Sequence, residues 1–288
     1  MALGAIMAFV PSCGMTLHET LDEPEFFGTP EQQAMAQRAW SLWALLKDDP
    51  RYSSYGRGVA LAAAAADNIP AQIALARITG AGACEHIPGR DLPGRRAALE
   101  AAGLATDGYV SWTNTPATFD RARQRLTARP LPADLSLVVV DADTPAAVLA
   151  QIDAVTQACE VFLPNGAYMR GRMGPAICVA ALDGAGRAVG AAASADPFHP
   201  ASDHSGTCWW GMLSTHPERR GEGIASYLGA MALIEMQDRF GMRRFFTGIR
   251  QDNAASEALC TGFGFAAQDE HILVAIDPRH FAGGRVSK

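Results

Sequence analysis

Short apolar runs and segments of helical periodicity alternate along the second half of the chain. The runs are bounded by turn residues, as buried strands are. They cover residues 135–140, 176–182, 188–195, 209–214, 245–249 and 271–276. Helical spacing covers residues 144–158, 225–240 and 254–261. The runs 176–182 and 188–195 flank a Gly-containing turn and predict an antiparallel hairpin, and the whole pattern predicts an α/β fold with a mixed sheet.

The first half of the chain is predicted to be richer in helices. Thr29 and Pro30 are typical of a helix N-cap and first helical position, and they begin a helix that we expect to reach residue 46. We predict further helices at 57–66, 71–78, 94–102 and 119–126, a loop at 80–94 and a strand at 109–113. Prolines 130 and 132 stiffen a linker, so we predict an N-terminal helix-rich region, 1–130, and a second domain, 131–288.

The amino-acid composition excludes several kinds of protein. The hydrophobic share of 49% is ample for a globular core, and the net charge of −6 gives no reason to expect nucleic-acid binding. Six scattered cysteines form no CxxC pair, which argues against structural zinc and a disulfide framework and favours a reducing cytosol. The apolar run in residues 1–14 lacks the basic start of a secretion signal, so we expect a weak strand or an irregular start there in a cytoplasmic protein. The Ala-rich stretch 58–66 is too short, and too polar at its end, to span a membrane.

The stretch from Trp209 to Ser226 runs from a predicted strand through a basic, Gly-containing turn into a helix. A helix N-terminus leaves backbone N–H groups unpaired and carries partial positive charge. Gly221 and Gly223 allow a ligand to approach the backbone closely, while Arg219 and Arg220 add forked cationic donors. This order of residues favours a phosphate or pyrophosphate site, and the alternative is an ordinary helix start with surface arginines.

Two segments together resemble a known family. Arg220-Gly221-Glu222-Gly223-Ile224-Ala225 resembles the R/Q-x-x-G-x-G/A loop of the GNAT superfamily of acyl-CoA-dependent N-acyltransferases. Residues 253–265 resemble that superfamily's N-x-x-A/S-x-x-x-Y-x-x-x-G-F segment at the expected distance downstream. The resemblance covers residues 135–277. It implies a mixed, mostly antiparallel, twisted sheet flanked by helices, with the strand ending at Thr215 and the strand ending near Gln251 splayed apart.

The resemblance also implies acetyl-CoA as co-substrate, without a metal. The pantetheine arm of acetyl-CoA is expected between the splayed strands, and the pyrophosphate of acetyl-CoA is expected on the Gly loop. The implied cofactor-binding residues are Leu213, Thr215, Arg220, Gly221, Gly223, Ile224, Ala225, Asn253 and Ser256. For Asn253 a role as helix N-cap is an alternative, and both roles are compatible.

The catalytic residues are less clear from the sequence. The superfamily often has a Tyr where this chain has Cys260, so we consider the Cys260 thiol as proton donor to the leaving thiolate, with a buried structural cysteine as the alternative. The strand 208–211 offers no carboxylate or imidazole as base. His204, with Asp203 beside it, is the nearest titratable group, and a surface-loop histidine or a water chain is the alternative.

These features predict an N-acetyltransferase that moves an acetyl group from acetyl-CoA to a small-molecule or protein amine by direct attack in a ternary complex. A non-catalytic CoA-binding sensor or interaction module of the same fold is the alternative. Nucleotide hydrolysis is not indicated, because the chain has no GxxxxGK[ST] sequence. Residues 1–130 are expected to be a helical accessory domain that shapes the acceptor pocket, or a degenerate copy of the acyltransferase fold. No nucleic-acid or membrane partner is expected, and homodimers are common among relatives.

Overall fold

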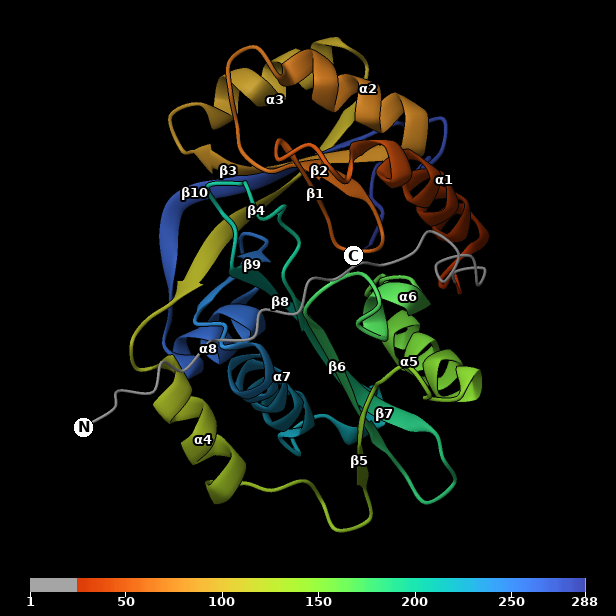
Figure 1. The fold of residues 1–288 in the computed structure, drawn as a ribbon, viewed down its shortest axis with the longest axis vertical. Coiled ribbons are helices and arrows are strands. Elements are labelled where there is room, and N and C mark those ends of the chain that lie inside the picture. Colours follow the sequence, from red (N-terminus) through yellow and green to blue (C-terminus); the bar gives the residue numbers. More distant parts are fainter. Residues whose placement is uncertain (1–24, 288) are drawn as a thin grey trace, which may run out of the picture.

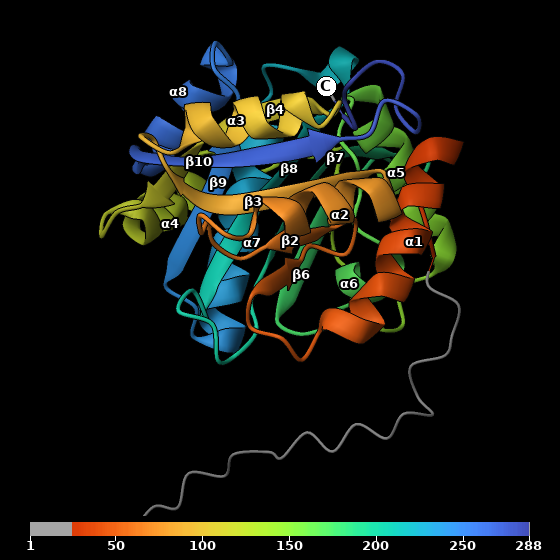
Figure 2. The ribbon, with the colours of Figure 1, turned by 90° about the horizontal axis from the view of Figure 1, so that it is seen from above.

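The computed structural model describes residues 25–287, and its strands form one open sheet (Figures 1 and 2). The order of the strands is β1-β2-β3-β10-β4-β9-β8-β7-β6-β5. Only the pairs β2/β3 and β8/β9 are parallel among the strands described. The strands are β1 (Tyr52–Ser54), β2 (Val59–Leu61), β3 (Ala81–Pro88), β4 (Ala105–Asn114), β5 (Ser136–Val139), β6 (Ala176–Leu182), β7 (Ala188–Ala195), β8 (Thr207–Thr215), β9 (Arg244–Ile249) and β10 (Phe265–Ile276).

Helices cover both faces of this sheet. They are α1 (Pro30–Leu46), α2 (Ile69–Thr79), α3 (Leu92–Ala101), α4 (Thr118–Ala128), α5 (Ala146–Ala158), the single turn α6 (Gly166–Met169), α7 (Ile224–Phe240) and α8 (Ala254–Phe263). The alternation of side chains along β6 separates two cores. Ile177 and Val179 pack with α7, whereas Cys178 and Ala180 pack with α5. Figure 1 accordingly shows α7 and α5 on either side of β6, β7 and β8.

The predicted mixed sheet and the predicted hairpin are confirmed. β6 and β7 pair antiparallel around residues 183–187. The helix after Thr29 begins with a capping box, in which Thr29 and Gln32 exchange side-chain-to-backbone hydrogen bonds. The weak strand predicted within residues 1–14 lies outside the described residues. No helix in the described part of the chain has the length and apolar character needed to cross a membrane.

Two predictions for the first half are wrong. β2 (Val59–Leu61) occupies part of the segment predicted as a helix, and β3 (Ala81–Pro88) occupies the segment predicted as a loop. Alanine favours helix in isolation, but all three residues of β2 are buried between β1 and β3. The Gly- and Pro-containing β3 pairs with β2 on one edge and β10 on the other. Tertiary pairing outweighs local propensity in both strands.

One order of elements occurs twice. β2-α2-β3-α3-β4 and β8-α7-β9-α8-β10 each begin with two parallel strands joined by a helix. β10 lies between β3 and β4, and β4 lies between β9 and β10. Each half therefore inserts its last strand into the part of the sheet that the other half builds, so the two halves share one sheet across the predicted boundary at residue 130.

Candidate functional site

The two central parallel strands separate at one point. β8 pairs with β9 only from Thr207 to Trp209, opposite Arg244 to Phe246. Beyond Phe246, β9 pairs with β4 on its other edge, while β8 continues along β7 to Thr215. A register shift in β8 and the positive φ of Met212, 59°, mark a bulge just past the separation. Within residues 25–287, the edge of β8 that faces β9 has no strand partner beyond Trp209, so its backbone groups are available to a ligand.

The end of β8 leads into the predicted Gly loop. Gly221 and Gly223 both have φ of 83°, a left-handed conformation that favours glycine. Gly223 is the N-cap residue of α7 and provides no side-chain cap. The Thr215 hydroxyl accepts a hydrogen bond from Ala225 N at 3.2 Å, so this N–H of the predicted set is already satisfied. The other N–H groups at the start of α7 keep the orientation and dipole that bind anions.

The cations around this loop differ from the expected pair. Arg219 is held by Asp134 and Glu222, at 2.9 Å and 2.7 Å, so its charge is compensated. Arg220 is exposed and has no side-chain partner among the described residues. Arg129, which the sequence suggested only as part of a linker, donates from Nη2 to Gly221 O at 3.2 Å. A Cβ built on Gly223 would meet the Arg129 guanidinium at 3.3 Å, so Arg129 lies directly over the loop.

The other predicted cofactor residues lie on both sides of the gap between the strands. Leu213 on β8 packs with the α7 core, and Ile224 is buried at the start of α7. Asn253 caps α8, since its side chain accepts from Ser256 N at 3.2 Å. The N-cap alternative for Asn253 is thus confirmed. A contact between Asn253 or Ser256 and a bound arm stays a prediction.

Cys260 lies in the core beside α7, 2% exposed. Burial raises the pKa of its thiol to about 12, because the thiolate would lose its hydration. A thiol that resists ionisation so strongly is a poor proton donor to another thiolate. The structure therefore favours the alternative of a buried structural cysteine.

His204 is half-buried and stacks on His86 of β3, with ring centroids 3.7 Å apart and planes 4° from parallel. Burial, and then the neighbouring His86, lower the pKa of His204. His86 Nδ1 lies 2.9 Å from Glu270 Oε2 on β10. His204 is thus joined to a polar cluster of the first half of the chain. The alternative of a free surface-loop histidine does not describe it.

This polar cluster was missed from the sequence. The hydroxyl of Tyr55 donates to Glu85 Oε1, and Glu85 is 1% exposed. Burial raises the pKa of Glu85 to about 8. Ser53 Oγ, Glu85 Oε2 and His86 Nε2 are buried without a hydrogen-bond partner among the described residues. Each such atom costs about 1–3 kcal/mol of stability. The one available signal was an acidic residue inside a short apolar segment, residues 81–87.

The cluster lies against the point where the strands separate. The Tyr55 ring makes edge contacts with Trp209 at 5.6 Å and Phe246 at 6.5 Å between centroids. Arg57 stacks over the Trp209 ring at 5.0 Å, and burial lowers its pKa. Residues of the first half of the chain therefore contact both Trp209 and Phe246, the last pair of residues that joins β8 to β9.

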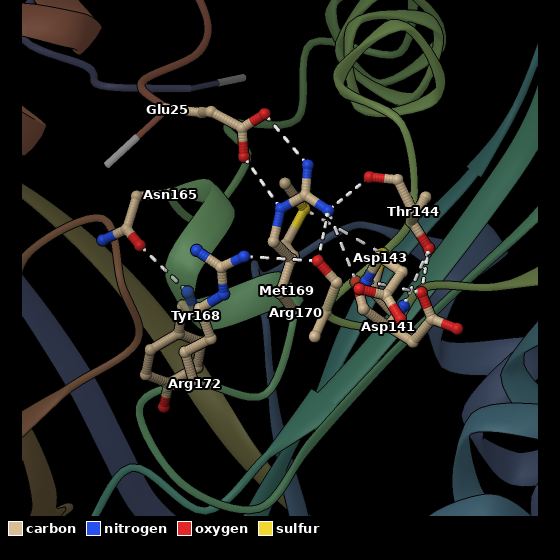
Figure 3. Close-up of polar contacts among 11 residues, drawn as sticks. Glu25, Asp141, Asp143, Thr144, Asn165, Tyr168, Met169, Arg170 and Arg172 are labelled. Carbon is tan, nitrogen blue, oxygen red and sulfur yellow. Dashed lines mark hydrogen bonds and ion pairs between the residues drawn. The ribbon is translucent and has the colours of Figure 1, made fainter. Parts of the chain in front are cut away.

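The segment after α5, residues 162–175, holds several elements together (Figure 3). Asn165 caps α6 and donates to Gly56 O, and the Tyr168 hydroxyl donates to Ser54 O at 2.7 Å. Arg170 pairs with Glu25 at 3.0 Å and donates to the backbone at Thr144, as Figure 3 shows. These contacts fix the loop that carries Tyr55.

The candidate site thus consists of the gap between β8 and β9, the Gly loop at the start of α7 and the N-terminus of α8 at Asn253. The model of the acetyltransferase (GNAT) family matches residues 154–265. This match includes both segments on which the resemblance was based, and it confirms the resemblance over that range. The comparison with curated proteins gave no match.

Solved GNAT-like structures share the fold. The GCN5-related N-acetyltransferase from Kribbella flavida is 14% identical, with a TM-score of 0.51 over 87% of this chain and 98% of that chain. The GCN5-related N-acetyltransferase-like protein from Streptococcus suis is 12% identical, with a TM-score of 0.50 over 84% of this chain and 99% of that chain. The predicted fold class, a mixed sheet flanked by helices as in GNAT-like N-acetyltransferases, is confirmed.

The Gly loop fits the phosphate part of an acyl-CoA, the substrate that the GNAT fold implies. Gly221 and Gly223 expose backbone that a side chain would cover, and Arg129 and Arg220 add uncompensated positive charge. The match to the GNAT family supports an acyltransferase. Among the residues that the structure describes, no group of three or more His, Cys, Asp or Glu side chains could hold a metal ion.

Proposed function

We propose that this protein transfers an acetyl group from acetyl-CoA to an amine by direct attack in a ternary complex. One observation carries the proposal: the unpaired edge of β8 beyond Trp209 leads through the Gly loop to a helix whose N-cap residue, Gly223, has no side chain to cap it. An extended arm can add to such an edge as a strand does, and its phosphates then reach the start of α7.

Each part of the binding surface has a role. The N–H groups from Gly221 to Ile224 hold the pyrophosphate, with Arg129 and Arg220 assisting. Backbone groups of Leu213 and Thr215 pair with the arm, and Asn253 and Ser256 border it from the β9 side. Bound acetyl-CoA supplies a thioester activated toward amines. In this proposal, a backbone N–H of the bulged part of β8 near Met212 stabilises negative charge on the thioester oxygen.

The alternative is a CoA-binding module without turnover. Two observations favour it: Cys260 is buried with a raised pKa, and β8 carries no carboxylate or imidazole. Release of free CoA thiol, followed with acetyl-CoA and a panel of primary and secondary amines, separates the two. Amine-dependent thiol release supports the transferase. Binding of acetyl-CoA with no release for any amine supports the module.

A further inference from the structure

The three unpartnered buried atoms belong to residues that meet in one place. Ser53 lies on β1, Glu85 and His86 on β3. The Ser53 hydroxyl lies near enough to the Glu85 carboxyl to favour its ionised form, although the two groups make no hydrogen bond in this structure. Glu85 and His86 follow each other at a bulge, where both residues lie opposite Ile272 of β10. His86 adopts a positive φ of 49° there, a strained conformation for a residue with a side chain.

The bulge directs both side chains of β3 toward the same region. The His86 ring lies 5.7 Å from the Phe246 ring. Glu85 accepts a hydrogen bond from Tyr55, whose ring also contacts Phe246. Phe246 is the last residue of β9 that pairs with β8. The unpartnered atoms therefore border the point where the thioester is expected in the proposed function.

Once Glu85 has lost its carboxyl proton, all three atoms can accept a hydrogen bond. His86 Nδ1 lies 2.9 Å from Glu270 Oε2, and the imidazole tautomer that donates from Nδ1 presents Nε2 as a lone pair. Glu85 Oε1 accepts the hydrogen bond from the Tyr55 hydroxyl, and Glu85 Oε2 has no hydrogen-bond partner. The Ser53 hydroxyl also has a lone pair to offer. Three buried acceptors match the three N–H donors of a primary ammonium group.

We propose that Ser53, Glu85 and His86 bind a primary ammonium group, and that this group is the amine of the acetyl acceptor. The second clause rests on the proposed function; the first does not. It makes the first half of the chain the part that selects the acceptor. Quaternary ammonium ions, which have no N–H donor, are excluded by the same three acceptors.

The site also provides a destination for the protons. Glu85, whose own proton leaves for solvent when the ammonium binds, takes one proton from the ammonium and keeps it, leaving a neutral amine. As the C–N bond forms and the C–S bond breaks, the second proton moves from the nitrogen to the CoA sulfur. One ammonium and one thioester thus give one amide, one thiol and one proton.

Several titratable groups face Glu85. Tyr55 follows β1, His86 is its neighbour on β3 and Tyr168 comes from α6. His204 stacks on His86 from the loop before β8. Arg57 lies on the far side of Tyr55, over Trp209. Burial keeps Glu85 protonated near neutral pH, so an ammonium ion that binds there must displace the carboxyl proton.

Calorimetry with propylammonium chloride tests the site, with tetramethylammonium chloride as the matched cation. At pH 7, in phosphate and in MOPS, we expect propylammonium to bind with release of about one proton, and tetramethylammonium not to bind. Glu85→Gln should weaken propylammonium binding by about tenfold or more, and Ser53→Ala should weaken it less. Asp153→Asn, a half-buried carboxylate beside Gly28, is the control and should leave binding unchanged.

Equal binding of the two cations, binding without proton release in the wild type, or full binding by folded Glu85→Gln would each overturn the proposal. The proton count uses the wild-type protein, so it decides the question even if a variant fails to fold. Acetyl-CoA is titrated into the same samples. If acetyl-CoA does not bind but propylammonium does, the proposed function fails and the ammonium site stands. If acetyl-CoA binds and propylammonium does not, only the ammonium site fails.

Discussion

Trp209 of β8 and Phe246 of β9 form the last pair that joins the two strands before they separate. Both aromatic rings contact Tyr55 from the first half of the chain. The point of separation is thus built by both halves. A ligand that enters between β8 and β9 from the α7 side meets residues of the first half at the end of its path.

The first prediction concerns Arg129. Its guanidinium lies over Gly223 and carries a charge that no carboxylate compensates in residues 25–287. Arg129→Ala should raise the Kd for acetyl-CoA by about tenfold, the loss expected for one charge-assisted phosphate contact. Arg123→Ala is the control and should leave the Kd unchanged, because Arg123 lies on α4, which ends just before Arg129, and pairs with Asp238. Equal Kd values for wild type and Arg129→Ala, measured by calorimetry, would remove Arg129 from the site.

The second prediction compares two helical glycines. A Cβ on Gly229 would lie 2.7 Å from Leu213 Cδ2 and 2.8 Å from Trp210 Cζ2, so Gly229→Ala must push apart the β8–α7 packing. We expect a loss of about 1–3 kcal/mol in unfolding free energy. Gly262 on α8 has open space around its Cβ position, so Gly262→Ala should gain about 0.5–1 kcal/mol. Chemical denaturation measures both, and the account of this packing fails if the two variants change stability in the same direction.

The third prediction concerns pH. The pKa of Glu85 rises on folding to about 8, so the folded state keeps a proton that the unfolded state loses. Stability from this group is therefore fully present below the unfolded pKa and declines as pH rises toward 8. Glu85→Gln removes this dependence, so the variant should gain stability relative to wild type between pH 5 and pH 8. Denaturant titrations at pH 5, 6.5 and 8 test it. A difference between the two proteins that stays constant over this range would show that Glu85 ionises normally.

Local motifs in the sequence led to the prediction of the cofactor site. The Gly loop depends on Gly221 and Gly223 at the start of a helix, and the Asn segment on a cap at Asn253. Both are properties of neighbouring residues. The fold of residues 135–277 followed from the same local patterns of strands and helices.

Features that depend on distant contacts could not be predicted. The Ala-rich β2 and the Gly-containing β3 become strands only through pairing with each other and with β10. Glu85 gains its significance from Tyr55, 30 positions away in the chain, and from burial by the sheet. Arg129 reaches the Gly loop across 92 positions. The local sequence offers only one hint, the acidic Glu85 inside the short apolar segment 81–87, and it gives no sign of which distant residues these side chains will contact.

The central claim is that the Gly loop at the start of α7 holds acetyl-CoA. Calorimetry with the wild type, Gly223→Trp and Gly186→Trp tests it most directly. Both glycines have positive φ, 83° and 79°, but Gly186 lies in the β6–β7 turn with open space around it. We predict that acetyl-CoA binds the wild type and Gly186→Trp alike and does not bind folded Gly223→Trp. Equal binding by all three proteins, or no binding by the wild type, would contradict the claim.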